Sequence, residues 1–452
     1  MDQEFDIAII GGGPAGYNAA ESASKAGKNV VLFEKNELGG VCLNVGCIPT
    51  KALLFSAKVL DYTSNAGKYG IDCLPGTPQS ARIFARKNKI VKKLTGAVSL
   101  KLRNCGVTVV KAQARLDGKE NDLFRISVQD GTYFARNVLL CSGSETVIPP
   151  IPGLKEGLGS YVLTSDMALN LNSIPQEIAI IGGGVIGMEF ASFFCSMGSK
   201  VTVIEMAQQI LPGFDSELTD YLQKTYSKKG VRFMTATRVT AVSPSGISYS
   251  SDSEPQGFLE TPVSLVSVGR RPNASALGLD TLNVEMDRAA VKVGLDMQTN
   301  VPGLFAAGDV TALSMLAHSA IAQAQVAIDN MCGTKSIMQY NAIPGVVYTN
   351  PEIAQIGLTQ ANAVAKGLDI DVRKLPMTYS GRFQAENEME NGLCKVVLDR
   401  RTNLILGAQM CGNMCSEIIS VIGVAIKFGI TLPQLQQTIF PHPSVTEILK
   451  EL

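Results

Sequence analysis

The sequence predicts an α/β protein with two Rossmann-like dinucleotide-binding domains followed by a C-terminal α+β domain. Two copies of one glycine-rich unit, at residues 5–34 and 177–205, carry the prediction of the first two domains. A cysteine pair, Cys42 and Cys47, follows the first unit and adds possible redox chemistry. The chain has 452 residues, of which 46% are hydrophobic, and this suffices for three or four domains with their own cores.

The first unit begins with an apolar strand, residues 5–10, that runs directly into a Gly-x-Gly-x-x-Gly turn at residues 11–16. A helix is expected over residues 17–27 and a second strand over residues 29–35, with Glu34 near its end. In such a unit the glycines let the backbone approach a pyrophosphate at the helix N-terminus, and the acid binds ribose hydroxyls. A tight turn without a ligand is the alternative, and the joint presence of strand, helix, strand and acid disfavours it.

The second unit, residues 177–206, repeats this order with Gly182, Gly184 and Gly187 in the turn and Glu205 as the terminal acid. Two such units imply two dinucleotides. Recognition of a 2′-phosphate would require arginine or lysine at or just after the acid. The residues that follow Glu205 are instead Met206, Ala207, Gln208 and Gln209. The second site is therefore predicted to prefer NAD(H) to NADP(H).

The segment from Gly39 to Lys51 carries the two cysteines five positions apart. On an ideal helix such positions point about 140° apart, so a disulfide would require a distorted helix, which Gly46 and Pro49 permit. Strain of this kind makes a disulfide easier to reduce and suits a catalytic bridge. Two ordinary buried thiols are the alternative.

Near the carboxyl end, His442 is followed five residues later by Glu447, in a chain with only two histidines. Imidazole is suited to proton exchange with a thiol near neutral pH, and a carboxylate can hold its tautomer if the chain turns between the two residues. Taken alone, His442 would more often be a surface loop residue. The cysteines and both nucleotide units favour a catalytic role.

Together these motifs resemble the flavoprotein disulfide reductases, most closely the dihydrolipoamide dehydrogenases, over nearly the whole chain. Further matches are residues 139–153, with Cys141 and Ser142 in place of the family's alanine and threonine, and residues 266–273, 301–310 and 315–320. The resemblance implies oxidation of protein-bound dihydrolipoamide to lipoamide through a Cys42–Cys47 disulfide and FAD, with reduction of NAD+ to NADH. Many relatives carry a second histidine two positions before the catalytic one, where this chain has Phe440.

The resemblance also implies roles for individual residues. Cys42 would be the interchange thiol and Cys47 the thiol beside the flavin, while His442 and Glu447 would form the catalytic base. Lys51 would lie near the flavin ring and pair with Glu189. The residues implied for FAD are Gly11, Gly13, Pro14, Ala15, Gly16, Glu34, Lys35, Gly40, Val41, Lys51, Ser142, Gly143, Ser144, Asp309, Met315, Leu316, Ala317 and His318. The residues implied for NAD are Gly182, Gly184, Val185, Ile186, Gly187, Glu189, Glu205, Val239, Gly269 and Arg270.

The resemblance predicts the domain organisation and the partners. The FAD-binding domain would span residues 1–145, the NAD-binding domain 146–268, the resumed FAD-binding or central domain 269–338, and the dimerisation domain 339–452. A homodimer is expected, with the cysteines of one subunit facing His442 of the other. The protein partners would be the lipoyl domains of an acyltransferase component of 2-oxoacid dehydrogenase complexes or the carrier protein of the glycine cleavage system.

Charge and composition exclude other classes. The net charge is zero, so charge gives no reason to expect nucleic acid or a membrane surface as a partner. No uninterrupted apolar run approaches the length of a spanning helix, and residues 1–4 lack the basic start of a leader, so a cytoplasmic enzyme is expected. The eight other cysteines are expected to be buried thiols, and no metal site is expected. The basic segment 82–103 is either a solvated helix face or a docking surface for an acidic partner.

Four other functions are alternatives to this one. A glutathione-type reductase should prefer NADPH, which the residues after Glu205 disfavour. A mercuric reductase usually ends in a cysteine pair, whereas this chain ends in residues 447–452 without one. A soluble transhydrogenase is a further flavoprotein alternative. A structural subunit without enzymatic activity would have lost the thiols or the histidine, and both are present.

Overall fold

The computed structural model describes residues 3–387 and 390–452, and the chain in it forms two compact units. The first unit comprises Met1–Ala52, Ala85–Val147 and Gly269–Gln339, and the second comprises Leu53–Phe84, Ile148–Val268 and Tyr340–Leu452. Residues 1 and 2 lie outside the described residues. They are the first residues of the expected FAD-binding domain and of the segment 1–4 that lacks a basic start. The two units are described separately below.

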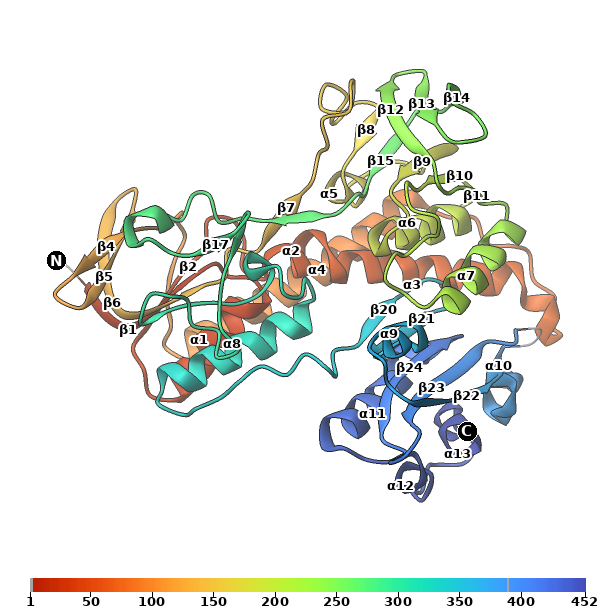
Figure 1. The fold of residues 1–452 in the computed structure, drawn as a ribbon. Coiled ribbons are helices and arrows are strands. Elements are labelled where there is room, and N and C mark those ends of the chain that lie inside the picture. The colour runs from red at the N-terminus through yellow and green to blue at the C-terminus, as the bar shows by residue number, and fades with distance from the viewer. Residues whose placement is uncertain (1–2, 388–389) are drawn as a thin grey trace. The chain divides into compact units, whose positions relative to one another are not determined.

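The first unit is built on a seven-stranded sheet. Its strands, in spatial order, are β3 (Thr108–Val110), β2 (Val30–Phe33), β1 (Gln3–Ile10), β6 (Gly131–Leu140), β5 (Leu123–Val128) and β4 (Arg115–Glu120), with β19 (Leu304–Ala306) also paired to β6. The strands β3, β2, β1, β6 and β19 are parallel neighbours, whereas β4, β5 and β6 form an antiparallel meander. Helices α1 (Pro14–Lys25) and α8 (Ala317–Met331) lie side by side against the parallel part (Figure 1).

The central parallel strands of the first unit, β1 and β2, contain continuous buried apolar runs, as buried parallel strands do. All four residues of β2 are buried, and its neighbour β1 has four fully or nearly fully buried residues in succession from Ile7 to Ile10. This arrangement confirms the predicted strand, glycine turn, helix and strand. Helix α1 begins at Pro14, three residues earlier than predicted, because proline is favoured in the first turn, where its missing N–H is not needed.

The second unit contains a parallel sheet of the same kind. Its strands, in spatial order, are β11 (Arg232–Met234), β10 (Lys200–Ile204), β9 (Glu177–Ile181), β15 (Ser264–Val266) and β8 (Val162–Leu163). Helix α6 (Val185–Ser196) follows β9 and packs on β10, and α7 (Ser216–Lys228) packs on β11. An antiparallel meander of β12 (Arg238–Ser243), β13 (Gly246–Ser250) and β14 (Gly257–Glu260) accompanies this sheet (Figure 1).

The carboxyl-terminal part of the second unit is an antiparallel sheet with helices, as the predicted α+β domain requires. Its strands, in spatial order, are β20 (Gly345–Val347), β21 (Ile353–Gly357), β24 (Ile405–Cys411), β23 (Leu393–Asp399) and β22 (Ile370–Leu375). Helix α11 (Cys415–Phe428) packs on β21 and β24, and its buried face includes Ile418, Ile419 and Ile422. The fold class predicted from the sequence is thus confirmed.

The remaining elements are short or connect these layers. The helices are α2 (Gly40–Val45), α3 (Cys47–Ser64), α4 (Ser80–Asn104), α5 (Ser165–Ala168), α9 (Gln360–Ala365), α10 (Gly381–Glu386), α12 (Leu432–Gln436) and α13 (Ile448–Glu451). The 3₁₀ turns are η1 (Ala66–Tyr69), η2 (Leu279–Leu282), η3 (Asp309–Thr311), η4 (Met377–Tyr379) and η5 (Val445–Glu447). Two small ribbons pair β7 (Ser144–Thr146) with β16 (Arg270–Pro272), and β17 (Met286–Asp287) with β18 (Ala290–Val291).

The structure bears on two composition-based expectations, and it corrects the expectation that the eight scattered cysteines are buried. The helical segment Gly40–Ser64 is long and apolar enough to cross a membrane by those two criteria alone, with a mean hydropathy of 1.4. Core helices meet the same criteria, and this segment carries Lys51, Lys58 and Asp61 and is interrupted at Gly46. All ten cysteines are free thiols, but only four of the eight outside the Cys42 and Cys47 pair are buried, and Cys73 is exposed.

The basic segment forms helix α4 and is mostly a solvated face. Arg82, Lys89, Lys92 and Lys93 are exposed, whereas Lys87 is buried and Lys101 forms an ion pair with Glu21. Docking of an acidic partner on this helix stays a prediction.

Candidate active site

The predicted residues of the first nucleotide site converge at the carboxyl edge of the parallel strands in the first unit. Gly11 follows β1 and donates to Phe33 of β2, while Cys141 follows β6 and donates to Ile10, each with an N···O distance of 2.8 Å. Asp309 follows the end of β19 at the same edge. Ligands of open α/β sheets bind outside this edge. The sheet therefore brings together the glycine turn, the segment that begins at Cys141 and the turn that contains Asp309.

The three glycines of the first turn have different structural needs. Gly11 adopts a φ of +113°, and a methyl group there would overlap the carbonyl oxygen of Cys141. A methyl group on Gly16 would overlap the carbonyl oxygen of Gly11. Gly13 has an ordinary φ of −73°, and the nearest atom to a methyl group there would be the Cα of Gly40 at 3.9 Å. Close backbone packing thus explains why Gly11 and Gly16 are glycines. The space beside Gly13 is open and is available for a ligand.

The acid of the first unit is held in place by the backbone. Glu34 accepts hydrogen bonds from the N–H groups of Gly12 and Asn36, with N···O distances of 2.7 Å to Oε2 and Oε1 respectively. A carboxylate has about four acceptor positions, so the group keeps capacity for a pair of ribose hydroxyls. The neighbouring Lys35 is exposed.

The segment after β6 supplies polar groups to the same edge. The hydroxyl of Ser142 is buried and has no hydrogen-bond partner within the described residues. Such a group is costly unless a ligand or water satisfies it, so the site fits a polar cofactor. Ser144 is buried, and its Oγ atom donates a hydrogen bond to Oδ2 of Asp309 at 2.5 Å. Gly143, between Ser142 and Ser144, has a φ of +70°.

The last predicted FAD residues lie at the start of α8. Leu316 precedes the helix, which begins at Ala317, and Met315, Leu316 and His318 are exposed. Gln323 in the same helix accepts a hydrogen bond from the N–H of Gly308 at 2.7 Å and so fixes the turn before Asp309.

The helix that carries Cys42 is anchored directly on the glycine turn. Gly39 donates from its N–H to the carbonyl oxygen of Gly12 at 2.8 Å. Gly40 has a φ of +56°, and a methyl group there would lie 2.7 Å from the Cα of Gly13. The two backbones therefore touch where no side chain fits, and the cysteine segment lies against the first nucleotide site.

The predicted distortion between the cysteines is a break at Gly46. Helix α2 ends at Val45 and α3 begins at Cys47, with Gly46 at φ −141° and ψ −114° between them. A methyl group on Gly46 would lie 2.9 Å from the carbonyl oxygen of Val41, so a side chain would obstruct this bend.

Both cysteines are free, half-buried thiols in this structure. A side-chain hydrogen bond with Cys47, together with burial, raises the pKa of Cys42 well above its usual value. Lys51, one turn farther along α3, lowers that pKa by its charge, but to a smaller extent. The raised pKa means that the Cys42 thiol keeps its proton more firmly than an ordinary cysteine does.

The second glycine turn repeats the geometry of the first. Gly182 has a φ of +105°, and a methyl group there would lie 2.6 Å from the carbonyl oxygen of Ser267. A methyl group on Gly187 would overlap the carbonyl oxygen of Gly182, whereas one on Gly184 would meet nothing within 4 Å. Again only the middle glycine leaves open space, as a bound pyrophosphate would require.

Glu205 is held as Glu34 is. Its carboxylate accepts from the N–H groups of Gly183 and Ala207, with N···O distances of 2.7 Å each. The residues beside the turn, Val185 and Ile186, begin α6, and Val185 is exposed. Val239 is buried in β12 of the same unit.

Glu189 is buried in α6, with 3% of its surface exposed. Its Oε1 atom accepts a hydrogen bond from the N–H of Tyr348 at 3.1 Å. Glu189 belongs to the second unit and Lys51 to the first, so the expected ion pair between them stays a prediction.

His442 and Glu447 form the hydrogen bond that their spacing allows. The Nδ1 atom of His442 lies 3.0 and 3.2 Å from the two carboxylate oxygens of Glu447, and Glu447 also accepts from the N–H of Ser444 at 2.8 Å. The bond from Ser444, followed by that from His442, lowers the pKa of Glu447. The turn η5 brings these groups together, and the imidazole is 83% exposed, with Nε2 available for a substrate.

The two halves of the predicted catalytic group lie in different units. Cys42, Cys47 and Lys51 belong to the first unit, and His442 and Glu447 belong to the second. Their joint action stays a prediction.

Two residues expected at the NAD site lie in the first unit. Gly269 is exposed and accepts from the N–H of Val147 at 3.0 Å. Arg270 donates through its guanidinium to the hydroxyl and carbonyl oxygens of Ser144, at 2.8 and 2.7 Å. Arg270 thus contacts the residue that hydrogen-bonds Asp309.

Sequence reasoning missed several supporting groups. Gly39 was not selected, although a pair of adjacent glycines before a cysteine helix was a visible signal of close backbone contact. The N–H groups of Asn36 and Ala207, which hold the two acids, had no signal, because backbone donors are the same in every residue. The contact of Tyr348 with Glu189 joins residues 159 positions apart and could not be read from the chain.

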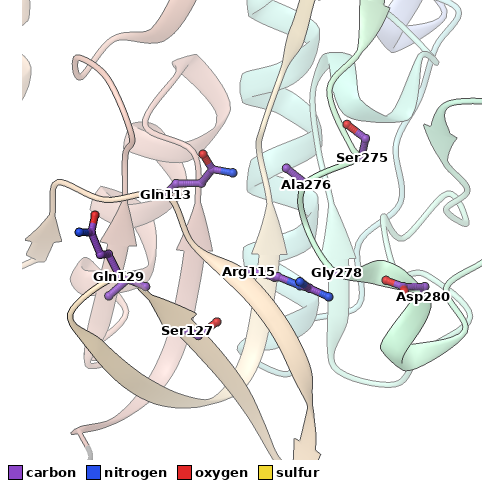
Figure 2. A pocket seen from close by; sticks show the side chains of 9 residues that line it. Gln113, Arg115, Ser127, Gln129, Ser275, Ala276, Gly278 and Asp280 are labelled. Atoms are coloured by element: carbon purple, nitrogen blue, oxygen red, sulfur yellow. The ribbon is translucent and has the colours of Figure 1, made fainter.

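A separate pocket of about 530 Å³ lies in the first unit between the β4–β5 meander and the loop before η2 (Figure 2). Its lining residues are Gln113, Arg115, Ser127, Val128, Gln129, Ser275, Ala276, Gly278 and Asp280. Figure 2 shows Arg115 pointing toward the side of Gly278 and Asp280, with Gln113 and Gln129 on the opposite side. None of the predicted site residues lines this pocket.

Comparison with known proteins identifies related families and structures. A family model described as pyridine nucleotide-disulphide oxidoreductase matches residues 5–329, and that family's dimerisation domain matches residues 343–452. Dihydrolipoyl dehydrogenase of Mycoplasma pneumoniae is 34% identical over 453 residues, which cover 99% of this chain and 97% of the relative. Dihydrolipoyl dehydrogenase of Thermus scotoductus is 36% identical over 454 residues, which cover 99% and 96% of the two chains.

Solved structures agree with these relatives. LpdA from Mycobacterium tuberculosis has a TM-score of 0.90 with this chain at 26% identity, covering 99% of this chain and 98% of its own. The HOCl-induced flavoprotein disulfide reductase RclA from Escherichia coli has a TM-score of 0.86 at 28% identity, covering 99% of both chains.

Proposed function

The chain belongs to the pyridine nucleotide-disulphide oxidoreductases, and we propose that it is a dihydrolipoyl dehydrogenase that uses FAD and NAD. The observation that carries the proposal is the contact of Gly39 and Gly40 with the glycine turn, because it places the Cys42 and Cys47 segment on the first nucleotide site. A dithiol beside one dinucleotide site, with a second dinucleotide site farther along the chain, has the parts needed to move an electron pair from a thiol substrate to a nucleotide.

The thiol half-reaction begins with the cysteines oxidised to a disulfide. A thiol of dihydrolipoamide loses its proton to Nε2 of His442, and the resulting thiolate attacks Cys42 while Cys47 leaves. The second substrate thiol then displaces Cys42, which gives lipoamide and the reduced cysteine pair. Because the pKa of Cys42 is raised, that thiol is a poor nucleophile near neutral pH in the reverse direction, and a base is required there as well.

Glu447 is proposed to hold His442 in the useful tautomer. A carboxylate on Nδ1 favours the proton on that atom, which leaves Nε2 as the base. The lowered pKa of Glu447 keeps its carboxylate ionised throughout the neutral range, so this orientation does not depend on pH there.

The two nucleotide sites divide the cofactors between them. We assign FAD to the site of Gly13, Glu34 and Asp309, and NAD to the site of Gly184 and Glu205. FAD, when bound, accepts an electron pair from the dithiol and delivers it to NAD+ as a hydride. The open space beside Gly13 and the unsatisfied hydroxyl of Ser142 fit such a cofactor. Lys51 is proposed to place its positive charge near the flavin ring and to pair with Glu189.

The carboxyl-terminal region is the dimerisation domain of this family, and the protein forms homodimers. We propose that His442 and Glu447 of one subunit serve Cys42 and Cys47 of the other. The proposed protein substrates are lipoyl domains of an acyltransferase component or of a glycine cleavage carrier protein. A reducing compartment such as the cytoplasm is proposed, because the eight cysteines outside the Cys42 and Cys47 pair are free thiols.

A steady-state assay of the purified protein tests the proposal. Dihydrolipoamide with NAD+ should give the highest kcat/KM among dihydrolipoamide, glutathione disulfide and mercuric ion, each measured with NAD(H) and NADP(H). A Cys42→Ser variant of the same preparation is the control for contaminating activity. Higher turnover of glutathione disulfide with NADPH, or of mercuric ion, would assign the chain to another member of the family.

Nucleotide choice is tested at Glu205. Its carboxylate should accept ribose hydroxyls and repel a 2′-phosphate, so NAD+ should exceed NADP+ by orders of magnitude in kcat/KM. Glu205→Arg should lower the ratio of kcat/KM with NAD+ to kcat/KM with NADP+. Glu34→Arg in the first site is the control, and the fraction of that variant that binds FAD should show an unchanged ratio. Comparable rates of the unmodified protein with both nucleotides would contradict the assignment.

A further inference from the structure

We propose that Arg270 is a positioning residue of the FAD site that acts through Ser144 on Asp309. The inference rests on the proposed function, since it assumes that Asp309 accepts a hydroxyl of bound FAD. The family resemblance implies a role for Arg270 at the NAD site. The contacts of its side chain within the first unit point to the other cofactor.

Three donors of the Arg270 guanidinium face the β7 strand. Nε donates to Oγ of Ser144 at 2.8 Å, and Nη2 donates to the carbonyl oxygen of Ser144 at 2.7 Å. Nη1 lies 3.4 Å from Oγ1 of Thr146. The backbone fixes this geometry, because β16 and β7 are antiparallel neighbours with Arg270 opposite Thr146.

The proton of the Ser144 hydroxyl is thereby directed to Asp309. A hydroxyl has one proton to donate, and its oxygen already accepts from Nε of Arg270. The proton therefore points to Oδ2 of Asp309, 2.5 Å away. Ser144 is 7% exposed, so water does not compete freely for either bond.

The hydrogen bonds from Arg270 to Ser144 and from Ser144 to Asp309 leave one carboxylate oxygen of Asp309 for the cofactor. Within residues 3–387 and 390–452, Oδ1 of Asp309 has no hydrogen-bond partner. The carboxylate is held at one oxygen, in the turn that follows β19, at the same sheet edge as the first glycine turn. The guanidinium also supplies a positive charge one hydrogen bond away from the carboxylate, which strengthens the Ser144 bond.

Neighbouring Arg271 provides a matched control. It lies on the same strand, but its Nε pairs with Glu145 at 2.7 Å, and the two side chains are 65% and 48% exposed. Arg271→Gln thus removes an equal charge from the next position without touching Ser144.

The test measures release of FAD from the holoenzyme on dilution, by the rise in flavin fluorescence. Ser144→Ala removes the link to Asp309 but keeps the backbone carbonyl that Arg270 also binds, so β7 should remain in place. We expect Ser144→Ala to weaken FAD binding about tenfold and Arg270→Gln about tenfold to a hundredfold, because bonds in charged networks contribute more than neutral ones. Arg271→Gln should change FAD binding less than twofold, and the KM for NAD+ should stay within twofold in all three variants.

An Asp309→Ala background, which removes the acceptor of the Ser144 hydroxyl, separates positioning from a general structural role. If Ser144 acts on Asp309, then Ser144→Ala should have less than a twofold further effect on FAD binding in Asp309→Ala. A full additional tenfold loss in that background would overturn the proposal. So would unchanged FAD binding in Ser144→Ala and Arg270→Gln, or a KM for NAD+ raised in Arg270→Gln with FAD binding intact. Failure of the unmodified protein to bind FAD would instead refute the proposed function itself.

Discussion

Replacing single glycines of the second turn by alanine should separate ligand binding from folding. Gly184 and Gly187 lie three residues apart at the start of α6, but only Gly187 is packed against other atoms. Gly184→Ala adds a methyl group into open space, and Gly187→Ala adds one against the carbonyl oxygen of Gly182 and 2.8 Å from Oγ of Ser267. The two variants thus add the same methyl group, at Gly184 where nothing lies within 4 Å and at Gly187 where neighbouring atoms leave no space.

The expected magnitudes follow from these surroundings. Gly184 has φ −72° and ψ −174°, which alanine adopts without strain. Reduced freedom of the unfolded chain should stabilise Gly184→Ala by about 0.4–1 kcal/mol, and alanine is a poorer N-cap by a similar amount, so stability should change by less than about 1 kcal/mol. Gly187→Ala over-packs the turn and should cost about 1–3 kcal/mol. The methyl group at Gly184 takes the space assigned to the pyrophosphate and should weaken NADH binding at least about tenfold, or about 1.4 kcal/mol.

Denaturant unfolding and equilibrium NADH binding on the same preparations check both expectations. Gly184→Ala should unfold like the unmodified protein and bind NADH weakly, and Gly187→Ala should show the loss of stability. Normal NADH affinity in Gly184→Ala would show that the open space is not the pyrophosphate site, and full stability in Gly187→Ala would refute the packing argument.

Three further predictions concern separate parts of the chain. His442→Gln should slow oxidation of dihydrolipoamide by roughly 10²–10⁴ and leave flavin reduction by NADH nearly unchanged in stopped-flow measurements; equal slowing of both would make His442 a structural residue. Lys395 is 3% exposed and pairs with Asp215 at 2.8 Å, so Lys395→Met should lower the free energy of unfolding by about 3–5 kcal/mol. Lys374→Met, at a side chain that is 50% exposed, should cost less than about 1 kcal/mol, and equal losses in the two variants would contradict the burial argument. Because the pKa of Cys42 is raised, that thiol should stay protonated as the pH rises through the ordinary thiol value of 9.0, so the reduced pair should hold at most one thiolate there. Ultraviolet thiolate absorbance reports the number, and two thiolates of the pair formed at or below pH 9 would contradict the assignment.

The fold class could be predicted because its signals are local. An apolar strand, a glycine turn, a helix and a terminal acid lie within 30 residues, and each copy reports the same βαβ geometry. The strands β23 and β24 and helix α11 of the carboxyl-terminal sheet are also mostly apolar segments. Helix α1 was placed too late, because the glycine turn and its first helical turn share residues such as Pro14.

The candidate site was predictable only where residue type carries the chemistry. Cys42, Cys47, His442 and Glu447 were selected from spacing and from the family resemblance, and the break at Gly46 followed from helix geometry. The contacts of Arg270 with Ser144 and of Tyr348 with Glu189 were not, because they join residues more than 120 positions apart through ordinary strand pairing and packing. The sequence alone does not distinguish a role for Arg270 at the FAD site from one at the NAD site. Its hydrogen bonds to Ser144 in the structure favour the FAD site.

The most direct test of the account is anaerobic reduction of the holoenzyme by one equivalent of dihydrolipoamide, followed by absorption spectroscopy. Electron transfer through the cysteine pair predicts a long-wavelength band in which the Cys47 thiolate donates charge to oxidised flavin. Cys47→Ser should abolish the band, whereas Cys42→Ser should show it without any added reductant. Reduction of the flavin without such a band, or a band that survives Cys47→Ser, would contradict the claim that this dithiol exchanges electrons with the cofactor beside it.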